Sequence, residues 1–481
     1  MVTLHFTDMA ALRRSVDIKG VLHSATVEEI EAAEAAHLVD GMPFILGTDA
    51  SYDHNLNLFL RSCPTMGVRS FNSLRSYARD LVIWIRFLEE RREGKSIWVA
   101  DRDDIAAFYQ ARRMSQTLHR ISAATWNRSL AALDKFYGWA LEQGFVRSRP
   151  FTYRQIPVPT RAGSSFVGEA NCAREPGARH GKMRFLSVDR YLLFRDVGLR
   201  GRLPDGREDL SWQGRNGERN ALFAELLITT GLRLQEGSSL LAPELPDHSA
   251  GHGSVSIRLA AAIAKGNKGR DVWLPRRILK RLHEYIALER SNILARDRSR
   301  RSKPRISDPI MVVAAGRRSA TIANGSGSGR ARFDLLSPWE RARLVDERTE
   351  KPLSLWLKEG GTAMSMPAWE VIFRRASERC QRFGIDLDVT PHVLRHSFAV
   401  HMLALLLREQ IGWVIQDRSD QSMAAYRRLI GDPLRILQRM MGHSRIESTY
   451  IYLDHLDDAQ ALVDAAVEQW GLETASPKVI S

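Results

Sequence analysis

The stretch 151–183 constrains the fold most, because it separates two parts of the chain that carry hydrophobic periodicity. It is rich in Pro, Gly, Ser and Arg and has no period of its own, which is typical of a linker. A chain of 481 residues is also too long for one ordinary core. We therefore predict a basic linker at 151–183 between two folded domains.

The part before the linker predicts a compact helical domain at 65–150. Apolar residues recur at helical spacing over 73–90 and again after Ser122, which is a favourable N-cap residue. Residues 1–64 give mixed signals, and we predict an N-terminal arm to which the sequence assigns no role.

The part after the linker, 184–470, predicts a larger and mainly helical domain. One region near 254–275 alternates like a pair of antiparallel strands, so the fold class is mainly α with a small antiparallel β-sheet (α+β). An irregular, arginine-rich stretch from about 296 to 333 predicts a charged insertion. Residues 471–481 are a predicted tail.

The composition of the chain limits the classes of molecule that it is expected to bind. The chain has 70 Lys and Arg against 56 Asp and Glu, a formal charge of +14, and such an excess attracts polyanions such as nucleic acid. A merely basic surface is an equally good explanation of the charge alone. Without a signal peptide or an apolar run of about 18 residues, the sequence predicts a cytoplasmic protein with no membrane partner.

Three cysteines, Cys63, Cys172 and Cys380, lie far apart in the sequence and form no CxxC pair. This pattern argues against a zinc site or a disulfide framework. We expect reduced thiols and no bound metal.

The first motif that can carry chemistry is Arg233, which follows the apolar helix ending at Gly231. Glu236, three residues later, can orient its guanidinium group. Taken alone, a structural Arg–Glu pair is the commoner explanation.

The second motif is the turn of the predicted 254–275 hairpin, which carries Lys265, Lys268 and Arg270. A lysine at such a tip can enter a DNA groove, and Lys268 and Arg270 are candidate DNA contacts. A solubilising charge at a strand edge is the alternative.

The third motif opens a helix, with Thr390 as its predicted N-cap and Pro391 as its first residue. His392 and Arg395 then lie three apart on one face of the first turn, where a helix N-terminus already favours an anion. His396 is expected to be peripheral.

The fourth motif places His443 in a turn after Gly442, followed by a predicted Ser-x-x-Glu capping box at 444–447. Tyr450 and Tyr452 come just beyond it. In isolation, amphipathic packing explains two such tyrosines.

The polar face of the predicted helix after Ser122 carries Asn127, Arg128 and Lys135. These residues are candidate DNA contacts, and a solvated face of a helical bundle is at least as good an explanation for any one of them.

In combination, the four motifs resemble those of the tyrosine recombinases, also called phage-type integrases. The matching stretches are TGLRLQE, AKGNKGRDVWLP, TPHVLRHSFA and MMGHSRIESTYIY, in that order. ATWNRSLAALDKFYGWALEQG also looks like part of the family's SAM-like helical core-binding domain. The resemblance covers roughly residues 65–470, and it implies a core-binding domain followed by a catalytic domain. Since the stretches near 296–366 and 409–432 depart from the compact family pattern, the resemblance implies that they are insertions.

The resemblance implies roles around one scissile phosphodiester. Arg233 and Arg395 are expected to bind the non-bridging oxygens and to stabilise the charge of the transition state. His443 is expected to donate to the phosphate or to support the site. The arginines and the lysine supply the charge stabilisation that a bound metal ion would otherwise give, so no cofactor is expected.

The same resemblance makes Tyr452 the nucleophile that forms a 3′-phosphotyrosyl bond. Lys265 is expected to protonate the leaving 5′-oxygen, and His392 to help move the proton of the tyrosine. Lys268 competes with Lys265, and Tyr450 competes with Tyr452, although the family's interval from the Gly-His pair favours Tyr452.

The expected function is site-specific recombination or integration of double-stranded DNA by a homotetramer on paired sites, which is a monomer when free. A type IB topoisomerase and an inactive DNA-binding protein are the alternatives. The helical tail after Tyr452, HLDDAQALVDAAVEQW, favours the recombinase, because such a tail can dock on a neighbouring protomer. Packing of the tail against its own domain is the alternative.

Overall fold

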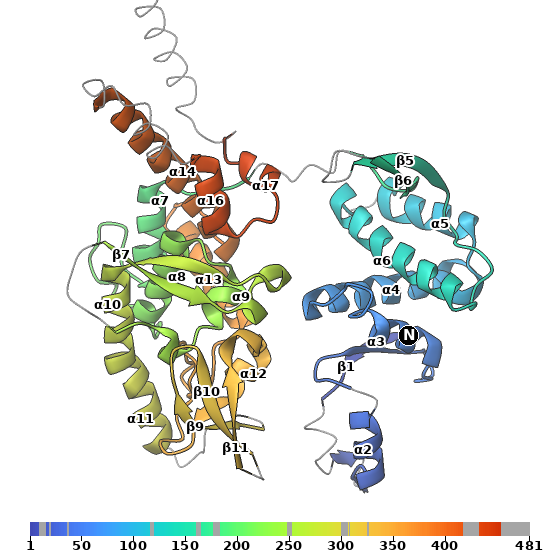
Figure 1. Ribbon diagram of the computed structural model, residues 1–481, viewed down its shortest axis with the longest axis horizontal. Coiled ribbons are helices and arrows are strands. Elements are labelled where there is room, and N and C mark those ends of the chain that lie inside the picture. The colour runs from blue at the N-terminus through green and yellow to red at the C-terminus, as the bar shows by residue number, and fades with distance from the viewer. Residues whose placement is uncertain are drawn as a thin grey trace, which may run out of the picture. The chain divides into compact units, whose positions relative to one another are not determined.

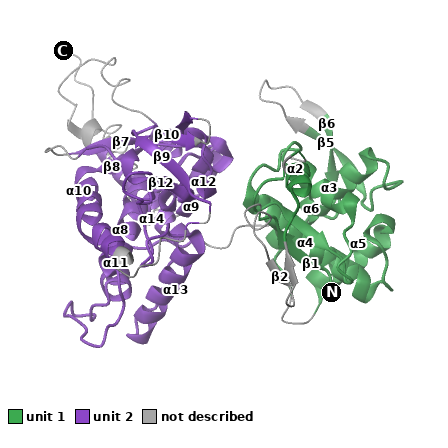
Figure 2. Cartoon of the chain, turned by 90° about the horizontal axis from the view of Figure 1, so that it is seen from below, with its two compact units in different colours: residues 1–182 green, residues 183–481 purple. Residues whose placement is uncertain are grey.

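The computed structural model divides the chain into two compact units, residues 1–182 and 183–481 (Figure 2). We call them the N-terminal unit and the C-terminal unit. The predicted tail and most of the predicted insertion at 409–432 lie outside the described residues. The described residues are 1–8, 16–18, 21–35, 38–115, 120–159, 165–176, 183–247, 253–299, 306, 308–324, 327–416 and 432–453.

The N-terminal unit is mainly helical (Figure 1). Ser122 accepts a hydrogen bond from the backbone N–H of Thr125, which confirms the predicted cap. The described elements are β1 (Thr3–Phe6), β2 (Val16–Ile18), β3 (Val21–His23), α2 (Val27–Ala35), β4 (Pro43–Leu46), α3 (His54–Ser62), α4 (Phe71–Arg91), α5 (Arg102–Tyr109), α6 (Ala123–Glu142), β5 (Tyr153–Pro159) and β6 (Ser165–Asn171).

Residues before 65 belong to the core of this unit, which differs from the predicted separate arm. Val2, Ile45 and Phe59 are buried in the same cluster as Trp84 of α4 and Tyr137 of α6. Strand β1 pairs with β4 in antiparallel fashion. The apolar face of α3 needs a partner, and α4 and α6 supply it.

The predicted linker also differs from the expectation, because much of it forms the antiparallel hairpin β5–β6. The segment after β6 is fastened to α6. The indole N–H of Trp126 donates to the carbonyl of Ala173 at 2.8 Å, and the Asn127 side chain bonds both backbone groups of Glu175. The division between the two units falls after Lys182.

The C-terminal unit is mainly helical with small sheets, which confirms the predicted fold class. Its described helices and strands are α7 (Val188–Leu193), the π-helical turn η3 (Phe194–Leu199), α8 (Gly217–Thr230), α9 (Leu234–Ser238), β7 (Ser254–Leu259), η5 (Ala261–Ile263), η6 (Lys265–Asn267), β8 (Arg270–Pro275), α10 (Arg276–Tyr285), α11 (Ser291–Ser299), β9 (Ile310–Ala315), β10 (Ser319–Asn324), β11 (Gly327–Arg332), α12 (Pro338–Arg343), β12 (Leu344–Asp346), α13 (Met366–Arg382), α14 (Pro391–Gln416), α16 (Pro433–Met441) and α17 (Glu447–Tyr450).

Helix α8 is the central element of this unit and is buried on nearly every face. The ring of Phe223 on α8 stacks on Trp369 of α13 at 3.7 Å between centroids, and Trp356 packs edge-on against both rings. Since Trp356 is fully buried in this core, the last part of the predicted 296–366 insertion belongs to the core.

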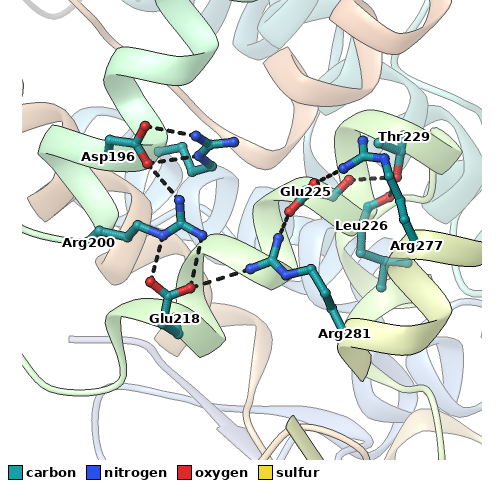
Figure 3. Close-up of polar contacts among 9 residues, drawn as sticks. Asp196, Arg200, Glu218, Glu225, Leu226, Thr229, Arg277 and Arg281 are labelled. Carbon is teal, nitrogen blue, oxygen red and sulfur yellow. Dashed lines mark hydrogen bonds and ion pairs between the residues drawn. The ribbon is translucent and has the colours of Figure 1, made fainter. Parts of the chain in front are cut away.

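An ion network also fixes α8 between η3 and α10 (Figure 3). The buried carboxylate of Glu225 pairs with Arg277, at 2.5 Å, and with Arg281. At the other end of α8, Arg200 pairs with Glu218 at 2.7 Å. A buried carboxylate is tolerated only when it is paired, so this network holds the helix that leads to Arg233 in one position.

The predicted irregular region contains three strands, which differs from the expectation. Strands β9, β10 and β11 form a four-stranded sheet with β12, in the order β11-β10-β9-β12. We call it the insertion sheet. One face carries the buried residues Val312, Ala320 and Leu344, which form an apolar cluster with Phe333. No helix in the described ranges is long and apolar enough to cross a bilayer.

Candidate active site

Arg233 owes its position to a sharp change of direction at the end of α8. Gly231 has a left-handed conformation, with φ of 66°, and a Cβ atom there would lie 2.4 Å from the Phe398 ring. Only glycine fits such a position without strain. The chain then turns, and Arg233 becomes the residue that precedes α9.

Glu236 is fully buried and gathers two arginines. Its carboxylate accepts from the backbone N–H and the guanidinium of Arg233, at 2.8 and 2.9 Å. It also accepts two hydrogen bonds from Arg270, at 2.9 and 2.7 Å. Burial raises the pKa of Glu236, but Arg270 and Arg233 outweigh burial and hold that pKa at about 2. Glu236 therefore stays ionised and fixes both guanidinium groups.

Arg270 has a supporting position, which differs from its prediction as a DNA contact. Its side chain is 10% exposed, and its Nε donates to the carbonyl of Met440 at 3.2 Å. A Cβ atom at Gly442 would lie 2.9 Å from its Cδ. Arg270 thus links strand β8 to the end of α16 instead of facing solvent.

Arg395 lies deep in the site, on the first turns of α14, and is 3% exposed. Its guanidinium donates to the carbonyls of Gly231 and Met441, which lie at the ends of α8 and α16. Burial, followed by the charges of Arg233 and Arg270, lowers the pKa of Arg395 to about 9. A bound anion would relieve this buried positive charge.

His443 follows Gly442, whose left-handed φ of 63° ends α16. Its Nδ1 forms a 3.0 Å hydrogen bond with the hydroxyl of Thr449. Burial, followed by the charges of Arg395, Arg233 and Arg270, lowers the pKa of His443 to about 4. The imidazole is therefore neutral near pH 7 and can donate one hydrogen bond and accept one.

The structure separates the two candidate tyrosines. Tyr450 is 47% exposed, whereas Tyr452 is 1% exposed and lies against the ring of His443, with 6.1 Å between centroids. Burial raises the pKa of Tyr452, and the charges of Arg395 and Arg233 oppose the shift. The phenol of Tyr452 thus lies in the field of both predicted catalytic arginines.

The hydrogen-bond partner of the Tyr452 hydroxyl is His396, with 3.2 Å between Nδ1 and the phenolic oxygen. The sequence analysis expected this histidine to be peripheral. His392, the predicted proton carrier, is exposed and its ring lies 4.2 Å from that of His396. The i,i+4 spacing of the two histidines on α14 was the signal that could have paired them.

The predicted cap at 444–447 is wrong, because α17 begins at Glu447 after Ile446 and has no side-chain cap. The predicted start of α14 is confirmed, because the Thr390 hydroxyl accepts from the backbone N–H of Val393 at 3.3 Å.

The candidate lysines lie on the turn between β7 and β8, which pair in antiparallel fashion as predicted. Lys265 and Lys268 are both exposed, and neither forms an ion pair with another described residue. Gly266 and Asn267 have positive φ values of 72° and 56°, which shape the turn. The structure does not bring either ammonium group to the arginines and Tyr452.

The DNA-contact candidates of the N-terminal unit have different surroundings. Asn127 is committed to Glu175 beyond β6. Arg128 pairs with the buried Asp80 at 3.1 Å, although its side chain remains 53% exposed. Lys135 is half-buried. Of the three, Arg128 has the most surface to offer a ligand.

Among the described residues, no group of three or more His, Cys, Asp or Glu side chains is arranged to hold a metal ion. What gathers instead is a set of guanidinium groups, one carboxylate, two imidazole rings and a phenol. This chemistry fits a phosphodiester anion and a tyrosine nucleophile.

Comparison with known proteins agrees with this chemistry. The SAM-like N-terminal domain of phage integrases matches residues 56–144, and the phage integrase family matches residues 210–405. The chain belongs to the tyrosine recombinase (phage integrase) family. It is thus a member of an enzyme family that recombines DNA at specific sites, and the predicted resemblance is confirmed.

The matched regions bear on the candidate residues unequally. The second match contains Arg233, Lys265 and Arg395. The nucleophile candidate Tyr452 lies beyond the end of that match, so its assignment depends on the geometry described above.

Several recombinases resemble the chain, two of them over about four fifths of its length and one over about half. XerD of Halalkalibacterium halodurans is 23% identical over 401 residues, which cover 83% of this chain and 92% of that protein. XerD of Mycobacterium tuberculosis is 24% identical over 384 residues, or 79% and 86% of the two chains. An integrase/recombinase of Escherichia coli is 27% identical over 232 residues, or 48% and 53%.

Solved structures also resemble it. The XerH site-specific recombinase, in a post-cleavage complex with a palindromic difH substrate, has 16% identity and a TM-score of 0.44, covering 88% of this chain and 90% of that one. A lambda integrase dimer bound to a core site has 12% identity and a TM-score of 0.41, covering 82% and 94%.

Proposed function

We propose that this tyrosine recombinase cleaves and rejoins double-stranded DNA through a covalent bond to Tyr452. The observation that carries the proposal is the placement of a buried phenol beside His396, within the field of Arg395 and Arg233. An exposed surface tyrosine would need none of these surroundings.

In the proposed reaction, the phenolic oxygen of Tyr452 attacks the scissile phosphorus as the bond to the 5′-oxygen breaks. The product is a 3′-phosphotyrosyl bond and a free 5′-hydroxyl group. Rejoining reverses the step with the 5′-hydroxyl of the same or another strand as nucleophile. Because the phosphotyrosyl bond keeps the energy of the broken phosphodiester, rejoining needs no nucleotide.

The arginines stabilise the charge that develops on the non-bridging oxygens. Glu236 holds Arg233, and the carbonyls of Gly231 and Met441 hold Arg395. Two donors fixed in advance cost no reorganisation when the transition state forms. The neutral His443 ring is placed to donate a further hydrogen bond to the phosphate.

The proton of the Tyr452 hydroxyl passes first to His396, which is its hydrogen-bond partner. The neighbouring, exposed ring of His392 then connects His396 with solvent. The 5′-oxygen receives its proton from Lys265, whose turn must approach the site when DNA binds. This proposal keeps a role for His392 and adds His396 between it and the nucleophile.

Tyr452 must also become accessible, since a side chain that is 1% exposed cannot reach an incoming phosphate. We propose that DNA binding displaces α17 and the residues that follow it, while α16 stays in place, so that the phenol leaves the cover of His443. Cleavage is thereby restricted to the DNA-bound protein.

The proposed partner is double-stranded DNA, and the proposed assembly is a homotetramer on two paired sites that forms from free monomers. Cyclic assembly requires each protomer to present a surface to its neighbour. The chain beyond residue 453 is the proposed contact, as expected from its apolar stripe.

A type IB topoisomerase is the alternative, because it also forms a 3′-phosphotyrosyl bond. The experiment measures covalent adducts on nicked suicide substrates from the genomic surroundings of the coding sequence, together with supercoil relaxation and recombination between two sites. Adducts with recombinant products support the proposal. Relaxation by a monomer, with no recombinant from any paired native sites, would leave the topoisomerase.

A further inference from the structure

The basic charge of this protein is concentrated in one short region. Residues 296–333 contain ten Lys and Arg and two Asp, which gives a formal charge of +8 within a chain whose total is +14. These 38 residues include strands β9, β10 and β11 of the insertion sheet. A region that carries more than half of the net charge dominates the local field.

Four described arginines cluster at one end of the insertion sheet. Arg330 and Arg332 are two residues apart on β11 and therefore point to the same face. Arg332 is paired in register with Ser319, which follows the turn that carries Arg317 and Arg318. We call Arg317, Arg318, Arg330 and Arg332 the arginine cluster.

The sheet has two unlike faces. Val312, Ala320 and Phe333 are buried on the inner side, and Ala331, between Arg330 and Arg332, packs against them. Arg330 and Arg332, on either side of Ala331, are consequently directed away from this core. All four members of the arginine cluster are exposed.

The arginine cluster lacks close acidic partners. Arg332 approaches Asp334 only to 3.5 Å, and Arg330 donates to the hydroxyl of Ser319 at 3.0 Å. Arg317 and Arg318 form no ion pair with another described residue. The arginines around α8, by contrast, pair with carboxylates at 2.5 to 2.7 Å (Figure 3). Exposed guanidinium groups are available to an anionic ligand when they have no acidic partner among the described residues, like those of Arg317 and Arg318, or only a distant one, like that of Arg332.

The edge beside the arginines is open. β11 is an edge strand of its sheet and begins Gly-Ser-Gly, and a Cβ atom added at Gly327 or Gly329 would have no atom within 4 Å. Small residues let a ligand backbone come close to the strand, so the arginines can reach it without steric hindrance.

The sheet is connected to the turn that carries Lys265. The carboxylate of Asp334, just after β11, accepts a hydrogen bond from the backbone N–H of Ala261 in η5, at 3.2 Å. Four residues later the chain reaches Lys265. A duplex bound at that turn thus has the root of the insertion sheet beside it.

We propose that the arginine cluster is an additional DNA-binding surface that holds the sugar-phosphate backbone of the duplex outside the cleavage site. This inference rests on the proposed function for its choice of ligand. The proposed contacts are to phosphates, which fix the position of the duplex and carry no sequence information. It adds affinity and orientation, and takes no part in the chemistry.

The test measures the salt dependence of duplex binding. The probe is a random-sequence duplex of roughly 40 base pairs, since phosphate contacts do not depend on sequence. All proteins carry Tyr452→Phe, so that binding is separated from cleavage. The variant is R330S/R332S, and the matched control is R374S/R375S, which removes two exposed arginines from α13.

The association constant K falls as salt rises, and each lost phosphate contact should reduce the steepness of log K against log salt by about 0.9. If both arginines contact phosphates, the slope of R330S/R332S is therefore shallower than that of the parent protein by about 1.8. Between 50 and 200 mM salt, the parent protein then loses roughly twelvefold more affinity than the variant. The control should keep the parent slope, and R317S/R318S, which changes only a turn, should lower it.

An unchanged slope in both cluster variants, or an equal change in the control, would overturn the inference. If binding is unaffected but the cluster variants made with an intact Tyr452 lose recombination, the surface binds a protein, and the DNA proposal is wrong. The outcome is separable from the proposed function, because adduct formation by protein with an intact Tyr452 is measured on its own. Absence of any adduct would refute the function while leaving the salt result valid.

Discussion

Replacing His396 by alanine tests the proton path most directly. The substitution removes the hydrogen-bond partner of the Tyr452 hydroxyl, which lies 3.2 Å from Nδ1. It leaves Arg233, Arg395 and Glu236 with their own partners. The expected result is slow formation of the phosphotyrosyl bond with nearly normal DNA affinity.

The magnitude follows from the burial of the phenol. A buried hydroxyl that loses its partner costs about 1–3 kcal/mol, and 2 kcal/mol corresponds to roughly a thirtyfold change in rate. His396→Asn keeps a polar atom near the position of Nδ1, so it should recover most of the orientation but not the proton transfer. We therefore expect His396→Asn to lie between the wild type and His396→Ala.

The assay is single-turnover adduct formation on a nicked suicide substrate at saturating protein. His401→Ala is the matched control, because His401 lies further along the same helix and bonds the carbonyl of Leu186 instead. Equal rates for His396→Ala and the wild type would refute the proposed proton path. Equal losses in His396→Ala, His396→Asn and His401→Ala would indicate damage to α14 and not to the chemistry.

Three further predictions concern the same site. Tyr452→Phe should bind DNA and form no adduct, whereas Tyr450→Phe should form it, and the reverse pattern on a denaturing gel would move the nucleophile. Lys265→Ala should be rescued by a 5′-bridging phosphorothiolate, whose leaving group needs no proton, and rescue of Lys268→Ala instead would reassign the acid. Glu236→Gln should lower the free energy of unfolding by about 3 kcal/mol above pH 5, because a pKa held near 2 instead of 4.5 stabilises the folded protein only while Glu236 is ionised. In denaturant unfolding, the difference between the variant and the wild type should vanish as the pH falls from about 4.5 to 2. A difference that does not change with pH would contradict this prediction.

The sequence predicted the local elements of the site well because each motif carries its own boundary signals. Thr390 and Pro391 mark the start of α14, and Gly231 marks the end of α8. These signals act within a few residues and depend little on the rest of the fold. The alternation around the Lys265 turn likewise predicted the β7–β8 pair.

Tertiary contacts explain what the sequence could not predict. Arg270 reads as a hairpin-tip charge until the fold brings it to Glu236 and Met440. From the sequence, His396 is only the residue next to Arg395. In the fold it bonds the hydroxyl of Tyr452, which lies 56 residues later in the sequence. A side chain's partner across the fold has no local signature, so only the structure supplies it.

The same reasoning explains the linker and the insertion. Pro, Gly and charged residues indicate irregular backbone when they are read one window at a time. In the fold, β5 pairs with β6, and β9 and β10 cover an apolar cluster around Phe333. Strand pairing satisfies the backbone whatever the side chains are, and this makes short strands with polar or glycine-rich sequences hard to predict.

The electrostatics of the site connect its stability with its proposed activity. Two guanidinium groups, those of Arg233 and Arg270, bond the single carboxylate of Glu236, and a third, that of Arg395, lies in the field of that carboxylate. The uncompensated charge lowers the pKa of Arg395 and keeps His443 neutral. A phosphodiester brings the missing negative charge, so binding it removes a cost that the free protein carries. The site is therefore arranged to favour the anion over its own empty state, and most strongly when that anion gains charge during the proposed attack of Tyr452.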